Sequence, residues 1–220
     1  MLNKILLKIF GVKLVCSQYG EDLIIESLLP QKKDGFYIDI GANHPIKYSN
    51  TFLFYRKGWK GINVEPNPSR IWLFNIFRKR DLNLNIGIGK NKSEINFYIF
   101  KESTLSTFDK IASEEYKSMG HPIKKVIKIP ITPLSEIIEK HANQKEIDIL
   151  SIDTEGYDME VLESNDWNKF RPRFLIIETL EYKKDGAGKK LNNIFDPYTE
   201  KIGYRKIADT YINTIYEKTY

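Results

Sequence analysis

Cysteine is nearly absent from this chain. Its 220 residues include one cysteine, Cys16, so no disulfide can form within the chain and no zinc site of several cysteine thiolates can be built. No apolar run approaches the ~20 residues of a membrane-spanning helix. Residues 1–15 contain Lys4, Lys8 and Lys13 and so lack the uninterrupted apolar segment of a signal peptide. These absences favour a cytoplasmic protein.

Blocks of like charge are also absent. The 34 Lys and Arg residues against 29 Asp and Glu residues give a net charge of +5, but the two signs alternate along the sequence. A nucleic-acid-binding protein would show a basic block or a dense Lys/Arg face with interleaved aromatic residues. We therefore expect no nucleic-acid partner. The hydrophobic fraction of 41% is ordinary for a globular protein, and nothing in the sequence indicates an oligomeric state.

Short apolar runs alternate with helical patterns. The runs that predict strands cover residues 36–40, 62–65, 82–89, 94–100, 127–132, 147–153 and 174–180. The helical patterns cover residues 46–55, 68–77, 132–141 and 158–164, and residues 204–209 and 211–218 predict a hairpin. This alternation predicts an α/β fold: a doubly wound, mostly parallel sheet with helices on both faces and an antiparallel C-terminal hairpin. In such sheets ligands bind beyond the carboxyl ends of the strands.

The segment DIGAN, residues 39–43, ends the first predicted strand in a glycine turn. Glycine lets the backbone approach a ligand closely, and Glu65 at the end of the next strand can accept hydrogen bonds from a ribose diol. The glycine pattern that cradles a dinucleotide pyrophosphate is missing, because Asn43 and Ile46 stand where glycines would be needed. S-adenosylmethionine (SAM) has a ribose, no phosphate and a cationic end that suits Asp39. The alternative is a plain turn in which Asp39 caps a helix.

Other enzyme signatures do not occur. No tyrosine has a lysine four residues later, as the usual short-chain dehydrogenase pair requires, and no Gly-x-Ser-x-Gly or Walker A motif is present. The strand at 147–153 is followed by DTEG, not by the Asn/Asp-Pro-Pro-aromatic motif of enzymes that methylate nucleobase amines.

Several segments together resemble the FkbM-type SAM-dependent methyltransferases, over about residues 17–182. They are SQYGED (17–22), FYIDIGANHPIKYSNTFLFYRKGWKGINVEPNP (36–68), STLSTFD (103–109), DILSIDTEGYDMEVLESNDW (148–167) and RPRFLIIE (171–178). The resemblance implies a class I methyltransferase (Rossmann-like) fold and methylation of a hydroxyl, commonly on a sugar or a polyketide-derived product. The segment HPIKYSNT resembles the corresponding segment of the branch of this family that is found among bacterial surface-glycan genes.

The resemblance also implies residue roles. Residues 39–43 would hold the methionine end of SAM, Glu65 its ribose, and Gln18 and Tyr19 would close over it. The HPIKYSNT segment could reach SAM or the substrate, or could cap the following helix. The implied cofactor-binding residues are Gln18, Tyr19, Asp39, Gly41, Ala42, Asn43, Ser49, Asn50, Glu65 and Asp153.

The DTEG segment is the predicted catalytic patch. Methyl transfer to an alcohol needs a base or a metal to take the hydroxyl proton, and Asp153 and Glu155 follow a buried strand. With Glu178 and Asp158, they would repel one another unless they share protons or bind a cation such as Mg²⁺. Asp153, Glu155 and His44 are the catalytic candidates. Asp153, Glu155 and Glu178 would be the ligands if a metal is required, and Asp158 has the alternative role of stabilising a helix.

The sequence as a whole therefore predicts a SAM-dependent O-methyltransferase that acts on a bacterial surface glycan or its activated sugar precursor. The alternatives are a methyltransferase of a small secondary metabolite or a lipid-linked intermediate, and a non-catalytic scaffold that keeps the fold. The acceptor would then be a glycan or a small molecule.

Residues 1–16 predict an amphipathic helix ahead of a single domain at 17–220, because Leu2, Ile5, Leu6, Ile9 and Phe10 recur at helical spacing. This helix would either pack on the domain or touch an anionic membrane weakly, at the inner membrane face. Co-sedimentation with anionic vesicles compares the full-length chain with a 15–220 variant. Membrane contact predicts binding by the full-length chain only, whereas equal, negligible binding would exclude it.

Overall fold

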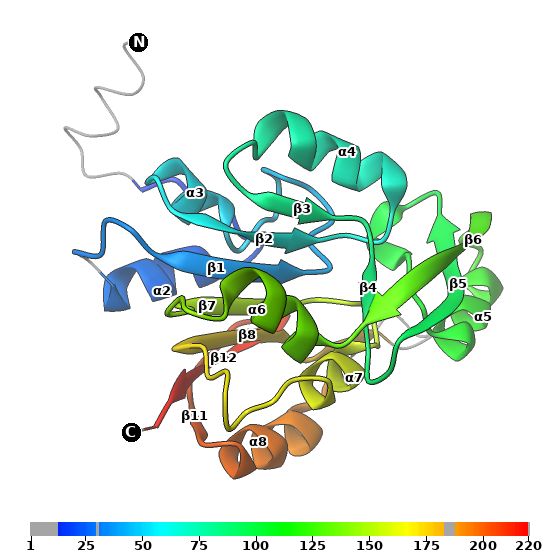
Figure 1. The fold of residues 1–220 in the computed structure, drawn as a ribbon. Helices are drawn as coiled ribbons and strands as arrows, with labels where there is room; N and C mark the ends of the chain where they lie inside the picture. The colour runs from blue at the N-terminus through cyan, green and yellow to red at the C-terminus, as the bar shows by residue number, and fades with distance from the viewer. Residues whose placement is uncertain (1–12, 30, 183–187, 220) are drawn as a thin grey trace.

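A twisted sheet of seven strands forms the centre of the protein (Figure 1). The computed structural model describes residues 13–29, 31–182 and 188–219. In the order in which they lie in the sheet, the strands are β11 (Tyr204–Asp209), β12 (Asn213–Lys218), β8 (Phe174–Glu178), β7 (Ile149–Ile152), β1 (Phe36–Ile40), β2 (Lys60–Val64) and β3 (Leu82–Leu84). The pairs from β8 to β3 are parallel, and β12 is antiparallel to both β8 and β11. The predicted mostly parallel sheet with an antiparallel terminal hairpin is confirmed.

Helices cover both faces of the sheet because its central strands are apolar on both sides. Every residue of β1, β7 and β8 is buried. Ile38 and Ile40 belong to a core that includes α6, α7 and α8, whereas Tyr37 packs on the opposite face with α2 and α3. The helices are α2 (Glu21–Leu28), α3 (Phe52–Arg56), α4 (Pro68–Phe77), α5 (Lys110–Ser118), α6 (Leu134–Ala142), α7 (Asp158–Glu163) and α8 (Asn192–Lys201). Within the described ranges, none is long and apolar enough to cross a membrane.

A second, three-stranded sheet lies beyond the carboxyl ends of β1 and β2 and, with α5, forms the arm on the right of Figure 1. Its strands are β4 (Gly87–Ile88), β6 (Ile123–Thr132) and β5 (Ser93–Phe100), and the 3-10 helix η1 (Ser103–Leu105) follows β5. A short pair, β9 (Leu180–Tyr182) and β10 (Gly188–Lys190), completes the structure. The arm thus covers the edge where ligands of parallel sheets bind.

Three predicted elements differ from the structure. The helix predicted over 46–55 begins only at Phe52, because residues 46–51 form turns in which Tyr48 has a φ of +58°. The strand predicted over 82–89 is divided between β3 and β4, which belong to different sheets. Thr132 ends strand β6, and α6 starts after Pro133 without a side-chain cap, because Thr132 still pairs with Ile88 of β4.

Three helices, α2, α5 and α8, lie outside the helical patterns predicted from the sequence. The nine residues of α5 carry four charges and little apolar periodicity, and the helix starts at Asp109, whose carboxylate accepts the backbone N–H groups of Ile111 and Ala112. The predicted N-terminal helix falls mostly on residues 1–12, outside the described residues, and the residues 13–16 have no regular secondary structure.

A fully buried arginine, Arg78, fixes the loop between β1 and α3. Its guanidinium pairs with Asp81 at 2.9 Å and donates to the carbonyl oxygen of Pro45 at 3.0 Å. It also donates to the hydroxyls of Tyr37 and Thr51 at 2.8 and 2.9 Å. Buried charges are stable only when they are paired and hydrogen-bonded. Because the partners of Arg78 include Pro45 and Thr51, satisfying its guanidinium holds the loop between β1 and α3 in one conformation.

We expect the substitution Arg78→Leu to lower the free energy of unfolding by about 3–5 kcal/mol, because it leaves the Asp81 carboxylate buried without its cation. Urea denaturation monitored by circular dichroism measures this. The matched control is Lys79→Leu, since Lys79 is exposed and should change the midpoint little. Equal midpoints for the two variants would show that Arg78 does not hold the loop.

Candidate active site

The predicted site residues line one cavity of about 510 Å³ at the carboxyl ends of the central strands. Its walls come from segments far apart in the sequence: the ends of β1, β2, β7 and β8, the 47–50 loop, and the arm. Of the predicted cofactor-binding residues, those that line the cavity are Gln18, Asp39, Gly41, Ala42, Asn43, Ser49, Asn50, Glu65 and Asp153. Tyr19 does not line it and has a side chain about half exposed to solvent. The acids Glu155 and Glu178 do line it.

The turn after β1 requires glycine at its first position. Gly41 has a φ of +76°, and a Cβ there would lie 1.7 Å from the carbonyl oxygen of Asp153, so no other residue fits. The backbone N–H groups of Gly41 and Ala42 both donate to the carbonyl oxygen of Val64. Because these contacts bring the ends of β1, β2 and β7 together, the turn forms the floor of the cavity.

Glu65 lies at the end of β2 with both carboxylate oxygens engaged. They accept the backbone N–H groups of Asn43 and Asn67, each at 2.7 Å. Burial raises the pKa of Glu65 to about 7, although these two hydrogen bonds oppose the shift. A carboxylate has about four lone-pair sites, so two remain for a ligand diol.

Asp39 is buried at the end of β1 and accepts a hydrogen bond of 2.7 Å from the hydroxyl of Thr51. Burial raises its pKa, while Thr51 and the charge of Arg78 act in the opposite direction. Beside it, the amide of Asn50 donates to the hydroxyl of Ser151 at 3.1 Å. The SNT residues therefore hold the site together. They also precede α3 directly, and the hydroxyl of Ser49 accepts the backbone N–H of Phe52, the first residue of that helix, at 3.1 Å.

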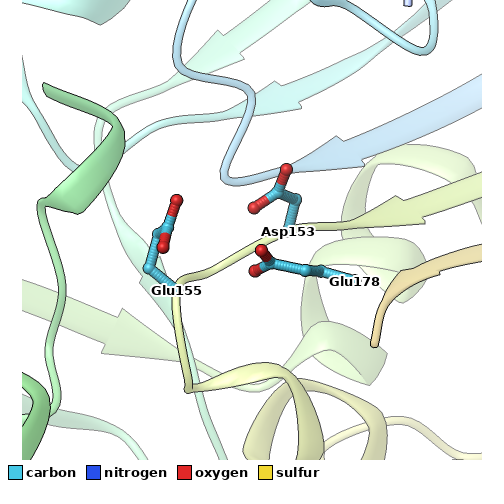
Figure 2. A group of neighbouring side chains, drawn as sticks. All are labelled: Asp153, Glu155 and Glu178. Carbon is cyan, nitrogen blue, oxygen red and sulfur yellow. The ribbon is translucent and has the colours of Figure 1, made fainter. Parts of the chain in front are cut away.

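Asp153, Glu155 and Glu178 form an acidic cluster in which one carboxylate oxygen of each lies within 4.8 Å of the others (Figure 2). Figure 2 shows Asp153 and Glu178 facing the same space from neighbouring strand ends, with Glu155 across from them. Burial raises the pKa of Asp153 to about 7, and the charges of Asp158 and Asp39 add to the shift. The pKa of Glu155 and that of Glu178 are raised well above the usual range, by burial and by the charge of Asp153.

A hydrogen bond within the cluster joins Glu178 to Asp153. It raises the pKa of Glu178 and lowers that of Asp153. Like-charged carboxylates this close cannot all be ionised. The cluster can therefore accept a proton from a substrate at Asp153, and its oxygen ligands could also hold a hard cation.

Asp158 lies outside the cavity wall. Its two carboxylate oxygens accept the backbone N–H groups of Thr154 at 2.9 Å and Gly156 at 3.3 Å. Asp158 is an acidic residue in the first turn of α7, the position that its alternative role of stabilising a helix requires, and its side chain also holds the turn that precedes the helix. The turn that it holds places Glu155 at a φ of +53°, a conformation that costs free energy for a residue other than glycine.

The two histidines near the site have different surroundings. The Nδ1 atom of His44 accepts the backbone N–H groups of Ile46 and Lys47, and burial, with the cations of Arg70 and Lys47, lowers its pKa. The imidazole thus stabilises the turn, and its role as a base stays a prediction. His121 lines the cavity from the arm.

Sequence reasoning missed the contacts that close the arm over the turn. The hydroxyl of Ser103 donates to the side-chain oxygen of Asn43 at 3.1 Å and accepts from Arg70. The hydroxyl of Thr107 donates to the backbone oxygen of Glu155 at 2.8 Å. The family resemblance singled out the STLSTFD segment that contains Ser103 and Thr107. The partners of these two residues lie far away in the sequence, so no local pattern indicated the contacts themselves.

The fit of SAM can be judged from the groups that line the cavity. A carboxylate with free lone pairs stands at the end of β2, further acids suit a cationic ligand, and Ile86, Phe97 and Leu105 offer apolar wall. The turn after β1 supplies no phosphate cradle, since the N–H groups of Gly41 and Ala42 are bonded to Val64. The donor set therefore fits a nucleoside with a positive charge and no phosphate.

This strand order, with a last strand antiparallel to its neighbours and a carboxylate after β2, defines a Rossmann-like α/β protein of the methyltransferase type. The family described as "Methyltransferase FkbM domain" matches residues 39–206. The chain belongs to the FkbM methyltransferase family, as its sequence predicted.

Comparison with solved structures gives a more distant likeness. The "Crystal structure of small RNA methyltransferase HEN1" superposes with a TM-score of 0.40 at 11% sequence identity, over 93% of this chain and 26% of that chain. This chain thus spans about a quarter of the length of that structure. No curated protein matches the sequence.

The raised pKa values predict a pH dependence of stability with an unusual sign. Asp153 and Glu65 have folded pKa values of about 7, against about 4 for unfolded carboxyls. Between pH about 4 and 7 the folded state holds protons that the unfolded state has released, so the free energy of unfolding falls as the pH rises.

We expect a higher urea midpoint at pH 5 than at pH 7.5 for the ligand-free protein. Asp153→Asn removes one of these groups, so this variant should be more stable than wild type at pH 7.5 and less sensitive to pH. Asp34→Asn, at an exposed position, is the control. A midpoint that rises from pH 5 to 7.5 would contradict the raised pKa values.

Proposed function

We propose that this protein is a SAM-dependent O-methyltransferase that transfers a methyl group to a hydroxyl of a bacterial surface glycan or of its activated sugar precursor. The observation that carries the proposal is that Glu65, the Gly41 turn and the acidic cluster line one cavity in a chain of a methyltransferase family. We place the protein in the cytoplasm, where activated sugars are used.

Bound SAM would supply an electrophilic methyl group on a sulfonium. The chain would hold it by the remaining lone pairs of Glu65 at the ribose and by the Gly41–Asn43 turn at the methionine end. Asp39 and Asp153, which line the cavity, would stabilise the positive charge. The arm, through Ser103 and Thr107, would exclude water from the site.

Asp153 is the residue best placed to take the acceptor's proton. Its pKa of about 7 matches the requirement that a general base titrate near the working pH. The carboxylate of Glu178 lies within 4.8 Å of that of Asp153 and would help to orient it. In the displacement that bound SAM would support, an O–C bond would replace the C–S bond of the sulfonium, and the acceptor's hydroxyl proton would pass to a carboxylate oxygen of Asp153.

Glu65→Ala tests the cofactor assignment. A hydrogen bond to a charged group contributes about 1.5–3 kcal/mol, so the dissociation constant of SAM should rise roughly 10- to 150-fold. Isothermal calorimetry measures this, with Glu94→Ala, at an exposed position on β5, as the control. Glu65 also holds two backbone N–H groups, so circular dichroism must show that the variant is folded. Unchanged affinity in a folded variant would reject the role of Glu65.

Asp153→Asn and chelation together test the chemistry. Direct base catalysis predicts that kcat falls by about 10²–10⁴, and that EDTA has no effect. SAM binding should be largely kept, because Glu65 and Asp39 still line the cavity. A metal held by Asp153, Glu155 and Glu178 predicts instead that EDTA abolishes turnover and Mg²⁺ or Mn²⁺ restores it. Near-wild-type turnover in Asp153→Asn together with insensitivity to EDTA would overturn both mechanisms and make His121 or His44 the next candidate.

The glycan assignment is tested by mass spectrometry of surface polysaccharide from a strain that lacks the gene. The proposal predicts that the polysaccharide has lost one CH₂ mass at each modified site. It also predicts that the purified protein transfers labelled methyl from SAM to this undermethylated polysaccharide. Binding of SAM without any transfer to it would point to a small-molecule or lipid-linked acceptor, and no binding at millimolar SAM would point to a scaffold.

A further inference from the structure

Two exposed tyrosines lie against each other at the rim of the cavity. The rings of Tyr19 and Tyr211 have centroids 5.4 Å apart and planes inclined by 54°. About half of each side chain is exposed, 49% for Tyr19 and 55% for Tyr211. Their sequence neighbours Gln18 and Ile212 line the cavity, so the pair stands immediately outside the cavity walls.

The pair is held by a buried carboxylate. Glu21 has no exposed surface, and it accepts hydrogen bonds from the backbone N–H of Tyr19 at 2.9 Å, the hydroxyl of Thr210 at 2.7 Å and the amide of Asn213 at 2.9 Å. The Glu21 side chain thus links the loop that contains Tyr19 to Thr210 and Asn213, the two residues on either side of Tyr211 and Ile212. Ring faces held rigidly in this way lose little entropy when they bind a ligand.

The pair lies at the opposite end of the sheet edge from the predicted ribose site. Glu65 follows β2, and Tyr211 precedes β12. In the order β12-β8-β7-β1-β2 these strands are four spacings apart, roughly 19 Å at about 4.8 Å each. Asp153, after β7, and Glu178, at the end of β8, lie between them. A ligand on the tyrosines would therefore approach the acidic cluster from the side away from the ribose.

We propose that Tyr19 and Tyr211 form the acceptor subsite and stack on a sugar ring of the glycan whose hydroxyl is methylated. A pyranose presents a C–H face that packs on an aromatic ring and hydroxyls that bond to polar tips, and tyrosine offers both surfaces. This inference rests on the proposed function. The family resemblance implied that Tyr19 contacts the cofactor, whereas this proposal gives it the acceptor sugar as its partner.

The test uses the double variant Tyr19→Ala/Tyr211→Ala, with Tyr19→Phe/Tyr211→Phe to keep the rings. Trp72→Ala is the control for loss of an exposed aromatic residue elsewhere, on α4. The probe is polysaccharide from the deletion strain. Saturation-transfer NMR reports its binding to the protein, calorimetry reports SAM affinity, and labelled methyl transfer gives KM and kcat.

We expect the alanine variant to raise the KM for polysaccharide by about 5- to 100-fold, for two aromatic contacts. It should also lose the saturation transfer to sugar protons, with the dissociation constant of SAM within about twofold of wild type. The phenylalanine variant, which keeps the rings and loses only the hydroxyls, should keep the saturation transfer and the SAM affinity and should raise the KM less than the alanine variant does.

Wild-type KM and saturation transfer in the alanine variant would overturn the subsite while leaving the proposed function intact. A dissociation constant of SAM that rises as much as the KM would overturn it too, since Tyr19 would then contact the cofactor. Wild-type protein that binds SAM but neither binds nor methylates the polysaccharide would overturn the subsite together with the glycan assignment.

Discussion

The buried guanidinium of Arg78 is the interaction on which the site depends most. It lies after α4 and reaches the Pro45 carbonyl, Thr51 and Tyr37, so it joins the cofactor turn, the following loop and the strand that precedes them. Thr51 in turn donates to Asp39. Arg78 therefore sets the position of the Asp39 carboxylate through Thr51, without a hydrogen bond of its own to Asp39. Burying a lone guanidinium would cost too much free energy, but here hydrogen bonds and an ion pair offset that cost.

The remainder of the cavity is built from conformations and charges that cost stability. Asn43, Tyr48 and Glu155 have positive φ values without being glycine, and all three line the cavity. Five carboxyl groups there, those of Asp39, Glu65, Asp153, Glu155 and Glu178, have raised pKa values because burial disfavours their charged forms. Backbone strain and buried charges of one sign are typical of ligand sites. A cationic ligand would stabilise the charged forms of these carboxylates.

The sequence predicted the features that depend on local pattern, namely the buried strands and the site residues at their ends. The buried strands end at Asp39, Glu65 and Asp153, and the rule that ligands bind beyond strand ends brought these residues together correctly. The first half of the helix predicted over 46–55 was wrong. Arg78 holds Pro45 and Thr51 on either side of it, and Cys16 accepts the backbone N–H of Ser49, contacts that no local propensity records. In the same way, nothing in the sequence pairs Tyr19 with Tyr211, since the sheet topology creates that contact.

The most direct test of the account is an experimental structure of the protein with S-adenosylhomocysteine, the product left after methyl transfer. The account predicts one molecule in the cavity, with its ribose hydroxyls on Glu65, its amino-acid end along the Gly41–Asn43 turn and its sulfur facing the acidic cluster. An empty cavity at saturating ligand, or a ligand whose ribose lies away from Glu65, would contradict it.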